Sequence, residues 1–400
     1  MTADPAAAKY SVGDEIELTI ERIVPRGLGL AFADGLTVFV RLAAPSDRVK
    51  VRLDEVRGRT AFGSISEIIE AGPGRRVPPC RHYGICGGCD MQHLTYEAQL
   101  AAKASIVEDC LRRLGKIESG PIAIEPGPAE LRYRTRARWH VDLAHNAVGY
   151  LRFGSHEAVN VTECPVLADE LADAMSEIRR DAETGRFLNE KAEVDAASGS
   201  DGVSLWSPHL ATAVKDVSAD IGGLRYEYSA QVFFQGNAGA VPRLVELAIG
   251  GLSGTSALDL YCGVGLLTLP LATTFDEVTG VESSRTSVEF ARRNADRAGL
   301  GNVELRCETA IRYLDAAAGS RPDLVVLDPP RSGTERGVIE ALIDVRPKQI
   351  SYVSCEPSML ARDLRKLLDG GYRIDGITAI DLFPQTHHVE TVARLSDMQL

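Results

Sequence analysis

A cysteine near the C-terminal end of the sequence stands where a side chain could react. Cys355 follows the apolar run 349–354 and comes two residues before Pro357. A lone cysteine is usually a small buried apolar residue. A cysteine just past an expected strand, in a turn stiffened by proline and over a helix start, is equally typical of a nucleophile. The sequence leaves both interpretations open.

Two further segments offer polar groups that could act with this thiol. Asp328 follows the apolar run 324–327 and precedes two prolines, which hold the chain extended and direct a polar group into a crevice. The segment 383–390 supplies two adjacent imidazoles and a carboxylate. A metal site made of His387 and His388 is disfavoured, because adjacent residues of a strand point to opposite faces.

A glycine-containing loop suggests a site for an adenosine ligand. The apolar strand 257–260 runs into a loop with Gly263 and Gly265, and glycines let a ligand approach the backbone closely. The next strand ends at Glu282, where an acid can bind both ribose hydroxyls. Each piece alone could also be a tight turn or a solvated glutamate. There is no third glycine, and Asp259 would repel phosphates but could pair with a cation, so the pattern favours S-adenosylmethionine over a dinucleotide.

A cluster of cysteines has the spacing of a metal site. Cys80, Cys86 and Cys89 lie close together around two glycines, and Cys164, before a proline, is the distant candidate for a fourth ligand. Four thiolates suit both zinc and an iron–sulfur cluster, and the spacing favours neither. Unrelated thiols are the alternative interpretation.

The elements that must position these groups fall into three regions. Residues 1–70 alternate in strand fashion between short turns, which predicts a small β-barrel of the oligonucleotide-binding type. The segment 71–79 is rich in glycine and proline and indicates a linker. Residues 71–240 predict a central α+β domain, which starts with the cysteines and a long helix over 95–114. From residue 241 to 400, strands alternate with helices, which predicts an α/β domain with a parallel sheet covered on both faces.

Shorter elements are expected within these regions. In the central domain we expect strands over 137–143, 149–153 and 225–234 and a helix over 168–180. In the α/β domain we expect strands over 256–259, 277–282, 303–306, 324–328 and 349–354. Ligands of such sheets bind beyond the carboxyl ends of the strands.

Charge and composition limit the kind of partner. The 400 residues carry a net charge of -12, so a nucleic-acid partner would need a local basic patch. Four arginines at 132, 134, 136 and 138 alternate, and on a strand they would form one basic face for phosphates, with a plain solvated face as the alternative. No apolar run approaches the length of a membrane span and the N-terminus lacks a signal sequence. We therefore expect a cytoplasmic protein, with no membrane partner and with reduced thiols.

Taken together, these residues resemble the family of S-adenosylmethionine-dependent RNA uridine-5 methyltransferases, which act on ribosomal or transfer RNA. The resemblance implies that Cys355 is the nucleophile and Glu390 the base that removes a proton. It spans nearly the whole chain and is carried by Phe233-Phe234-Gln235, residues 259–265, Asp328-Pro329-Pro330-Arg331, Ser354-Cys355 with Pro357, and residues 383–390. It implies that the cofactor and the target base are lined by Gln235, Tyr261, Gly263, Gly265, Glu282 and Asp328.

The resemblance also extends to the fold and to the other regions. It implies a Rossmann-like methyltransferase domain, an N-terminal barrel of the TRAM type that binds RNA, and a 4Fe–4S centre on the four cysteines, with a structural or RNA-contacting role. By the same analogy, ribosomal RNA is favoured over transfer RNA. The residue after Cys355 is usually Asn in this family and is Glu356 here, which changes the local hydrogen bonds but not the thiol.

The chemistry explains why these residue types are needed. Uracil C5 becomes nucleophilic only after a thiolate adds at C6, and a base must later remove the C5 proton. The charge that develops on O4 needs a donor, either Gln235 or a backbone amide, and Asp328 could accept from uracil N3–H or position the cofactor. The target base must be unstacked to be reached. Two other functions fit parts of the pattern: methylation of an exocyclic amine, which needs neither Cys355 nor Glu390, and a non-catalytic RNA-binding or assembly factor.

Overall fold

The N-terminal region forms a six-stranded sheet of order β1-β5-β6-β4-β3-β2. The computed structural model describes residues 9–184, 189–209 and 214–399. Irregular register between β5 and β6 bends these two long strands, and alternate residues of β4 are buried inside the curve. The small β domain expected from the sequence is confirmed. Its strands are β1 (Glu15–Thr19), β2 (Arg22–Val24), β3 (Leu28–Ala33), β4 (Leu36–Arg41), β5 (Arg48–Arg57) and β6 (Thr60–Glu70).

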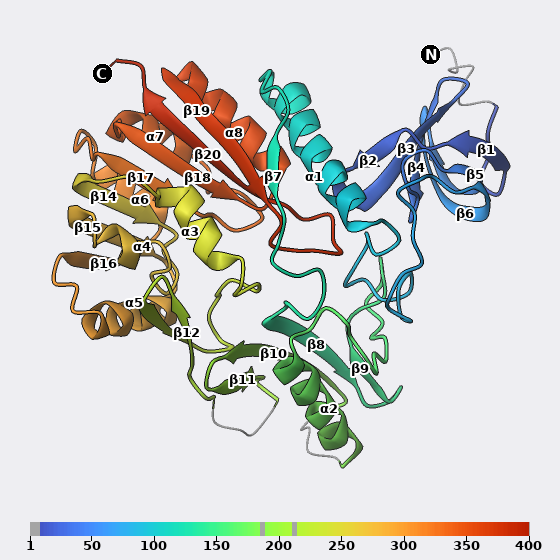
Figure 1. Cartoon of the computed structure of the whole chain (residues 1–400), viewed down its shortest axis with the longest axis horizontal. Helices are drawn as coiled ribbons and strands as arrows, with labels where there is room; N and C mark the ends of the chain where they lie inside the picture. Colours follow the sequence, from blue (N-terminus) through green and yellow to red (C-terminus); the bar gives the residue numbers. More distant parts are fainter. Residues whose placement is uncertain (1–8, 185–188, 210–213, 400) are drawn as a thin grey trace.

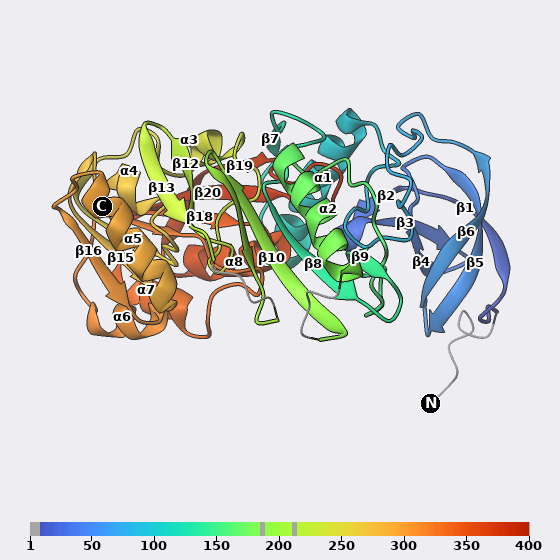
Figure 2. The ribbon, with the colours of Figure 1, turned by 90° about the horizontal axis from the view of Figure 1, so that it is seen from below.

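A four-stranded antiparallel sheet of order β11-β10-β8-β9 forms the middle of the molecule. Helix α2 (Asp169–Glu183) packs its apolar side on this sheet, where Trp139 and Val194 are fully buried. The sheet lies between the N-terminal and C-terminal sheets along the long axis (Figures 1 and 2). Its strands are β8 (Arg136–Asp142), β9 (Ala147–Gly149), β10 (Lys191–Gly199) and β11 (Gly202–Trp206), and the separate pair is β12 (Val217–Ile221) with β13 (Leu224–Tyr228).

The expected stripe of four arginines on one strand is only half correct. β8 begins at Arg136, so only Arg136 and Arg138 share a strand face. Arg132 has a left-handed backbone (φ 55°) and forms an ion pair with Asp169. Arg134 makes a single bridge to another loop and is half-buried.

The C-terminal region is built on an eight-stranded sheet of order β16-β15-β14-β17-β18-β20-β19-β7. The first five strands are parallel, as the sequence predicts, and β20 then pairs antiparallel with both neighbours, which the alternation pattern did not indicate. β17 is buried at all four residues because helices cover both faces. The strands are β7 (Ala123–Glu125), β14 (Gly254–Leu260), β15 (Phe275–Glu282), β16 (Val303–Cys307), β17 (Leu324–Leu327), β18 (Gln349–Ser354), β19 (Tyr372–Ile380) and β20 (Glu390–Asp397).

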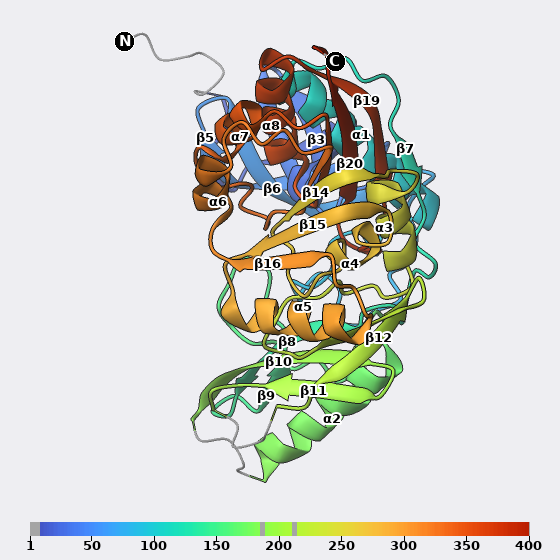
Figure 3. The same ribbon diagram turned by 90° about the vertical axis from the view of Figure 1, so that its left-hand side faces the viewer.

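Two apolar layers hold this sheet. α6, α7 and α8 pack on one face and α3 and α4 on the other, while α5 lies between the sheet and the β12–β13 pair (Figure 3). No helix in the described part of the chain is both long and apolar enough to cross a membrane. The helices are α3 (Val241–Ile249), α4 (Thr268–Leu271), α5 (Arg285–Arg297), α6 (Ala310–Ala316), α7 (Val338–Val345) and α8 (Pro357–Asp369).

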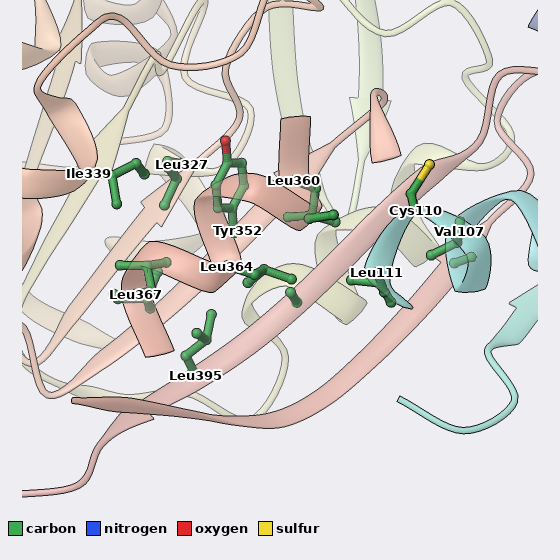
Figure 4. Packing of buried hydrophobic residues seen from close by; sticks show 14 of the residues in the cluster. Val107, Cys110, Leu111, Leu327, Ile339, Tyr352, Leu360, Leu364, Leu367 and Leu395 are labelled. Carbon is green, nitrogen blue, oxygen red and sulfur yellow. The ribbon is translucent and has the colours of Figure 1, made fainter. Parts of the chain in front are cut away.

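The long helix expected over 95–114 forms as α1 (Tyr96–Cys110) and continues as a wider turn over Leu111–Gly115. Its apolar side enters the core of the C-terminal sheet, where Leu111 packs near Leu360 and Leu364 (Figure 4). β7 pairs with β19 at the edge of the same sheet. Both elements come from the range expected for the central domain, yet they pack with the C-terminal sheet. The C-terminal region is therefore built from this early segment and from the chain after residue 240.

A buried ion pair joins α1 to the segment after β19. Lys103 Nζ lies 2.5 Å from Asp381 Oδ1 and donates to Phe383 O at 3.0 Å, and both charged side chains are fully buried. Breaking such a pair by removing one partner leaves an uncompensated charge in the interior. We therefore expect Lys103→Met to lower the free energy of unfolding by about 3–5 kcal/mol, measured by chemical denaturation.

The matched control is Lys366→Met, which breaks the exposed pair with Glu340. That pair lies in water, and its loss costs about 0–1 kcal/mol. An equal loss of stability in the two variants would contradict the account of the buried pair.

Candidate active site

A cavity of about 740 Å³ opens at the carboxyl ends of β14, β15, β17 and β18. Parallel strands end together at one edge of a sheet, which is where such folds bind ligands. The cavity brings together seven of the eight candidate catalytic and cofactor-binding residues: Gln235, Tyr261, Gly263, Glu282, Asp328, Cys355 and Glu390.

The eighth candidate, Gly265, does not line the cavity. Its backbone is left-handed (φ 93°), and a Cβ there would lie 2.6 Å from Leu269 Cδ1. Glycine is therefore needed at this position for the tight turn onto α4. Asp259 is also absent from the cavity wall: it accepts a hydrogen bond from Thr268 Oγ1 at 2.6 Å, and burial raises its pKa to about 7. The expectation that Asp259 meets a cationic ligand is wrong, because its side chain closes the same turn.

Backbone amides fix Glu282 at the end of β15. Gly263 N donates to one carboxylate oxygen at 3.2 Å and Ser284 N donates to the other at 2.7 Å. The oxygen that accepts from Ser284 N also accepts from Ser283 Oγ at 3.3 Å, a hydroxyl that can rotate away, and the other oxygen keeps a free lone pair. The carboxylate is therefore held in place and faces the cavity as an acceptor for the hydroxyls of a ribose. On the opposite wall, the Tyr261 hydroxyl donates to Glu335 at 2.8 Å.

The antiparallel pairing of β18 with β20 brings Cys355 and Glu390 to the same end of the sheet. The last pair of this ladder joins Ser354 to Thr391, and Cys355 and Glu390 are the neighbours of these two residues. Both side chains line the cavity, and the charge of Glu390 acts on the thiol and raises its pKa. A thiol and a carboxyl group from segments 35 positions apart in the numbering thus lie in one cavity.

Burial controls the protonation of these groups. Burial raises the pKa of Cys355 to about 12, Glu390 and Asp328 raise it as well, and the guanidinium of Arg331 acts against them. Burial and the charge of Asp328 raise the pKa of Glu390 well above its usual range, again opposed by Arg331. Glu390 is 2% exposed and its Oε1 has no hydrogen-bond partner. A buried carboxylate without hydrogen bonds is a strong base once it is ionised.

Asp328 is a further acidic residue that lines the cavity. Its pKa is raised to about 7 by burial, against a hydrogen bond from Gln235 Nε2 at 3.4 Å. The carboxyl and the amide can both turn toward a ligand, because the bond between them is long. Asp328 and Gln235 both line the cavity.

Arg331 is a site residue for which sequence reasoning gave no role. It directly follows the two prolines after Asp328, so the stiff strand exit carries it to the cavity. The arginine stands in the quoted motif, but an arginine after a proline predicts no role by itself. Its role depends on its position near Cys355, which only the structure gives. Phe233 was also quoted without a role, and its ring is 62% exposed at the cavity rim.

A groove of about 820 Å³ continues from the cavity toward the N-terminal sheet. We call it the arginine groove, because it is lined by Arg26, Arg134, Arg136, Arg138 and Arg331. Only two acidic residues, Asp90 and Asp195, are among its described lining residues. This is the local basic patch that an acidic protein needs to hold a polyanion.

The two histidines near the C-terminus lie at the edge of this groove. Their rings are 4.1 Å apart, since they belong to the loop before β20 and not to a strand. The expectation that they point to opposite faces is therefore wrong. His387 contacts Asp90, while burial lowers the pKa of His388 to about 2.

The four cysteines of the predicted metal site line one small cavity, together with Arg134 and Tyr150. Burial raises the pKa of Cys86 to about 11 and of Cys89 to about 12. Among the described residues, no three His, Cys, Asp or Glu side chains have the arrangement of a site for one metal ion. The thiols therefore surround a space without converging on a single point.

The parallel sheet, the acid that faces the cavity from β15 and the adjoining arginine groove define a Rossmann-like methyltransferase that uses S-adenosylmethionine and acts on RNA. Residues 214–397 match the family model of tRNA (uracil-5-)-methyltransferases, and residues 9–66 match the TRAM domain. The chain belongs to this RNA methyltransferase family.

Relatives agree with this assignment, and a solved structure shares the fold. The chain is 32% identical to an RNA methyltransferase of Aquifex aeolicus, described as uncharacterized, over 95% of this chain and 98% of that one. A similarly described protein of Halalkalibacterium halodurans is 30% identical over 97% and 98% of the two chains. The fold is shared with the tRNA (uracil-54, C5)-methyltransferase of Pyrococcus abyssi, solved with S-adenosyl-L-homocysteine, at a TM-score of 0.73 and 24% identity over 95% of this chain and 100% of that one.

Proposed function

We propose that the enzyme methylates C5 of a uridine in RNA through a covalent bond between Cys355 and uracil C6. The observation that carries this proposal is that the thiol of Cys355 and the carboxyl group of Glu390 line one cavity, next to the last paired residues of β18 and β20. Methylation of uracil C5 requires a nucleophile that adds to C6 and a base that removes the proton from C5. Methylation of an exocyclic amine would require neither Cys355 nor Glu390.

The reaction proceeds in three steps. The thiolate of Cys355 adds to C6, and the ring becomes an enolate with its charge on O4 and C5. S-adenosylmethionine, when bound, would supply the methyl group that C5 takes, with its S–CH3 bond broken and S-adenosylhomocysteine as the leaving group. Glu390 removes the C5 proton, the C5–C6 double bond reforms and the C6–S bond breaks, so that Cys355 leaves as the thiolate.

The other residues of the cavity prepare these steps. Arg331 favours the thiolate form of Cys355, and Glu282 offers its fixed carboxylate to the ribose of the cofactor. Gln235 and Asp328, which are hydrogen-bonded to each other, can recognise the polar edge of the base or the methionine part of the cofactor. The cavity is lined by four carboxyl groups and one guanidinium, so a cationic cofactor also stabilises their negative charge.

The raised pKa values predict how the rate depends on pH. Cys355 must lose its proton to attack and Glu390 must be ionised to act as a base, and both groups have a raised pKa. The reactive fraction therefore grows as the pH rises, by up to about tenfold per unit. We expect the single-turnover rate to rise from about pH 6 to about pH 9.

Arg331→Ala serves as the diagnostic variant for this pH profile. Removing the guanidinium raises the pKa of the thiol further, so the profile moves to higher pH, while Arg331→Lys keeps a cation in place. Alkylation of Cys355 by iodoacetamide at each pH reports the thiolate directly. A rate that is flat or falls with pH contradicts this account.

We further propose that the arginine groove holds the RNA backbone around an unstacked uridine, with the TRAM domain extending the contact through Arg26. We propose ribosomal RNA as the substrate, because the chain combines a TRAM domain with the four-cysteine cavity. The Pyrococcus abyssi enzyme that shares the fold is a tRNA methyltransferase, so transfer RNA is the alternative to be tested. We propose a cytoplasmic location, which an RNA substrate and reduced thiols would support.

We propose a 4Fe–4S cluster for the four-cysteine cavity, with zinc as the alternative. The residues fit a cluster: all four donors are thiols, the Tyr150 hydroxyl is buried without a partner, and Arg134 forms no ion pair within the described chain. Both side chains can donate to the sulfur atoms of an anionic centre. Methyl transfer requires no electron, so the role of the centre is structural.

The experiment that tests the proposed function combines the purified enzyme and labelled S-adenosylmethionine with unmodified ribosomal and transfer RNA transcripts. The products are digested and the labelled nucleoside is identified. We expect 5-methyluridine in ribosomal RNA. Label in an exocyclic amine selects the amine methyltransferase, and no label in any RNA selects a binding or assembly factor.

A further inference from the structure

We propose that Asp90 positions the catalytic carboxylate of Glu390. Asp90 directly follows Cys89, and it holds the segment 381–389, which we call the catalytic loop because it leads into β20. This inference rests on the proposed function, since it assigns Glu390 the role of base. It links the cysteine cavity to the cavity that contains Cys355.

Four contacts join Asp90 and its neighbour to the catalytic loop. The amides of Asp90 and Met91 donate to Gln385 O at 3.2 and 3.0 Å. In return, the Asp90 carboxylate accepts from His387 N at 2.7 Å and contacts His387 Nδ1. One short piece of the cysteine segment thus fixes two loop residues, three and five positions before Glu390.

The loop needs this support because its backbone is strained. Gln385 has a left-handed conformation (φ 71°) and is fully buried. A residue with a side chain adopts this region at an energetic cost and keeps it only where surrounding contacts fix it. Gln99 supplies two of those contacts, at 2.9 and 3.0 Å, and Arg76 a third at 3.0 Å.

Glu390 has little to hold it except its own backbone. Its Oε1 makes no hydrogen bond, so the position of the carboxylate follows the position of the loop and of the first residue of β20. Removal of the Asp90 carboxylate frees His387, three positions before Glu390, while the backbone contacts to Gln385 O remain. A shift of about 1 Å in a catalytic group costs up to roughly a hundredfold in rate.

The chemistry makes this role distinguishable from a purely structural one. Glu390 acts after Cys355 has bonded to C6 and after the methyl group has moved. A displaced base therefore stalls the enzyme as a methylated covalent adduct with RNA, whereas a poorly folded enzyme forms no adduct. The adduct survives denaturation with detergent because its C6–S bond is covalent.

The test compares Asp90→Ala with Asp90→Asn in the full-length enzyme. We expect turnover in Asp90→Ala to fall ten- to a hundredfold, with little change in KM for RNA, and a detergent-stable enzyme–RNA band to accumulate. Asp90→Asn keeps an oxygen that accepts from His387 N, so we expect it to restore turnover and to remove the band.

The matched control is Asp323→Ala, at the opposite end of the C-terminal sheet. Asp323 likewise contacts two nitrogen donors, in its case the backbone amides of Thr255 and Ser256, so its loss costs comparable stability away from the loop. Loss of turnover in Asp90→Ala without an adduct, or equal behaviour of Asp90→Ala and Asp323→Ala, overturns the inference. If the unaltered enzyme makes no 5-methyluridine, the proposed function itself fails, whatever the variants do.

Discussion

Cys355→Ala is expected to lose methylation of RNA by at least roughly 10³-fold, since nothing else in the cavity can activate C5. The uracil ring is too weak a nucleophile to take a methyl group without the bond at C6. Binding of S-adenosylmethionine should change little, because the residues proposed to bind it are still present. The measurement is methyl incorporation under saturating substrates, with calorimetry for cofactor binding.

Cys307→Ala provides the control for this prediction. Cys307 ends β16, is exposed and does not line the cavity, so its replacement removes a thiol without touching the reaction. Full activity in Cys355→Ala would overturn the covalent mechanism and favour transfer to an exocyclic amine. Equal losses in the two variants would point to general damage by thiol replacement.

Glu390→Gln is expected to separate the two halves of the reaction. Thiolate addition and methyl transfer need Cys355, while removal of the C5 proton needs a carboxylate, which an amide cannot replace. Turnover should fall by at least about 10²-fold, and the methylated RNA should remain bonded to the enzyme. Mass spectrometry of the adduct measures this result, because the adduct contains one added methyl group.

Glu356→Gln is the matched variant for the second prediction. Glu356 follows the nucleophile, and its side chain accepts from Ser358 N and Ser358 Oγ at the start of α8. Glutamine keeps the accepting oxygen, so turnover should stay within a few-fold of the unaltered enzyme. An adduct that accumulates in Glu356→Gln but not in Glu390→Gln would show that the base had been assigned to the wrong carboxylate.

The sequence predicted the individual chemical groups better than their arrangement. Asp328 and Cys355 could be placed at one sheet edge, because each follows an apolar strand of a parallel series. Glu390 came only from the family resemblance. Its position opposite Cys355 depends on the antiparallel β20, and no local pattern indicates that the last strand reverses its direction.

The errors have similar physical causes. From its place beside the glycine loop, Asp259 could pair with a cationic ligand, yet its side chain closes a turn with Thr268. Alternation of the arginines suggested one strand, but the chain turns at Arg132 and the strand starts at Arg136. Both outcomes were set by contacts with distant segments, which a local pattern does not contain.

The most direct measurement of the central claim uses RNA that carries tritium at uracil C5. If Cys355 and Glu390 act as proposed, each methyl group transferred releases one tritium atom to water, and Cys355→Ala releases none. Methyl transfer without release of tritium would place the new methyl group elsewhere than on C5 and would contradict the account.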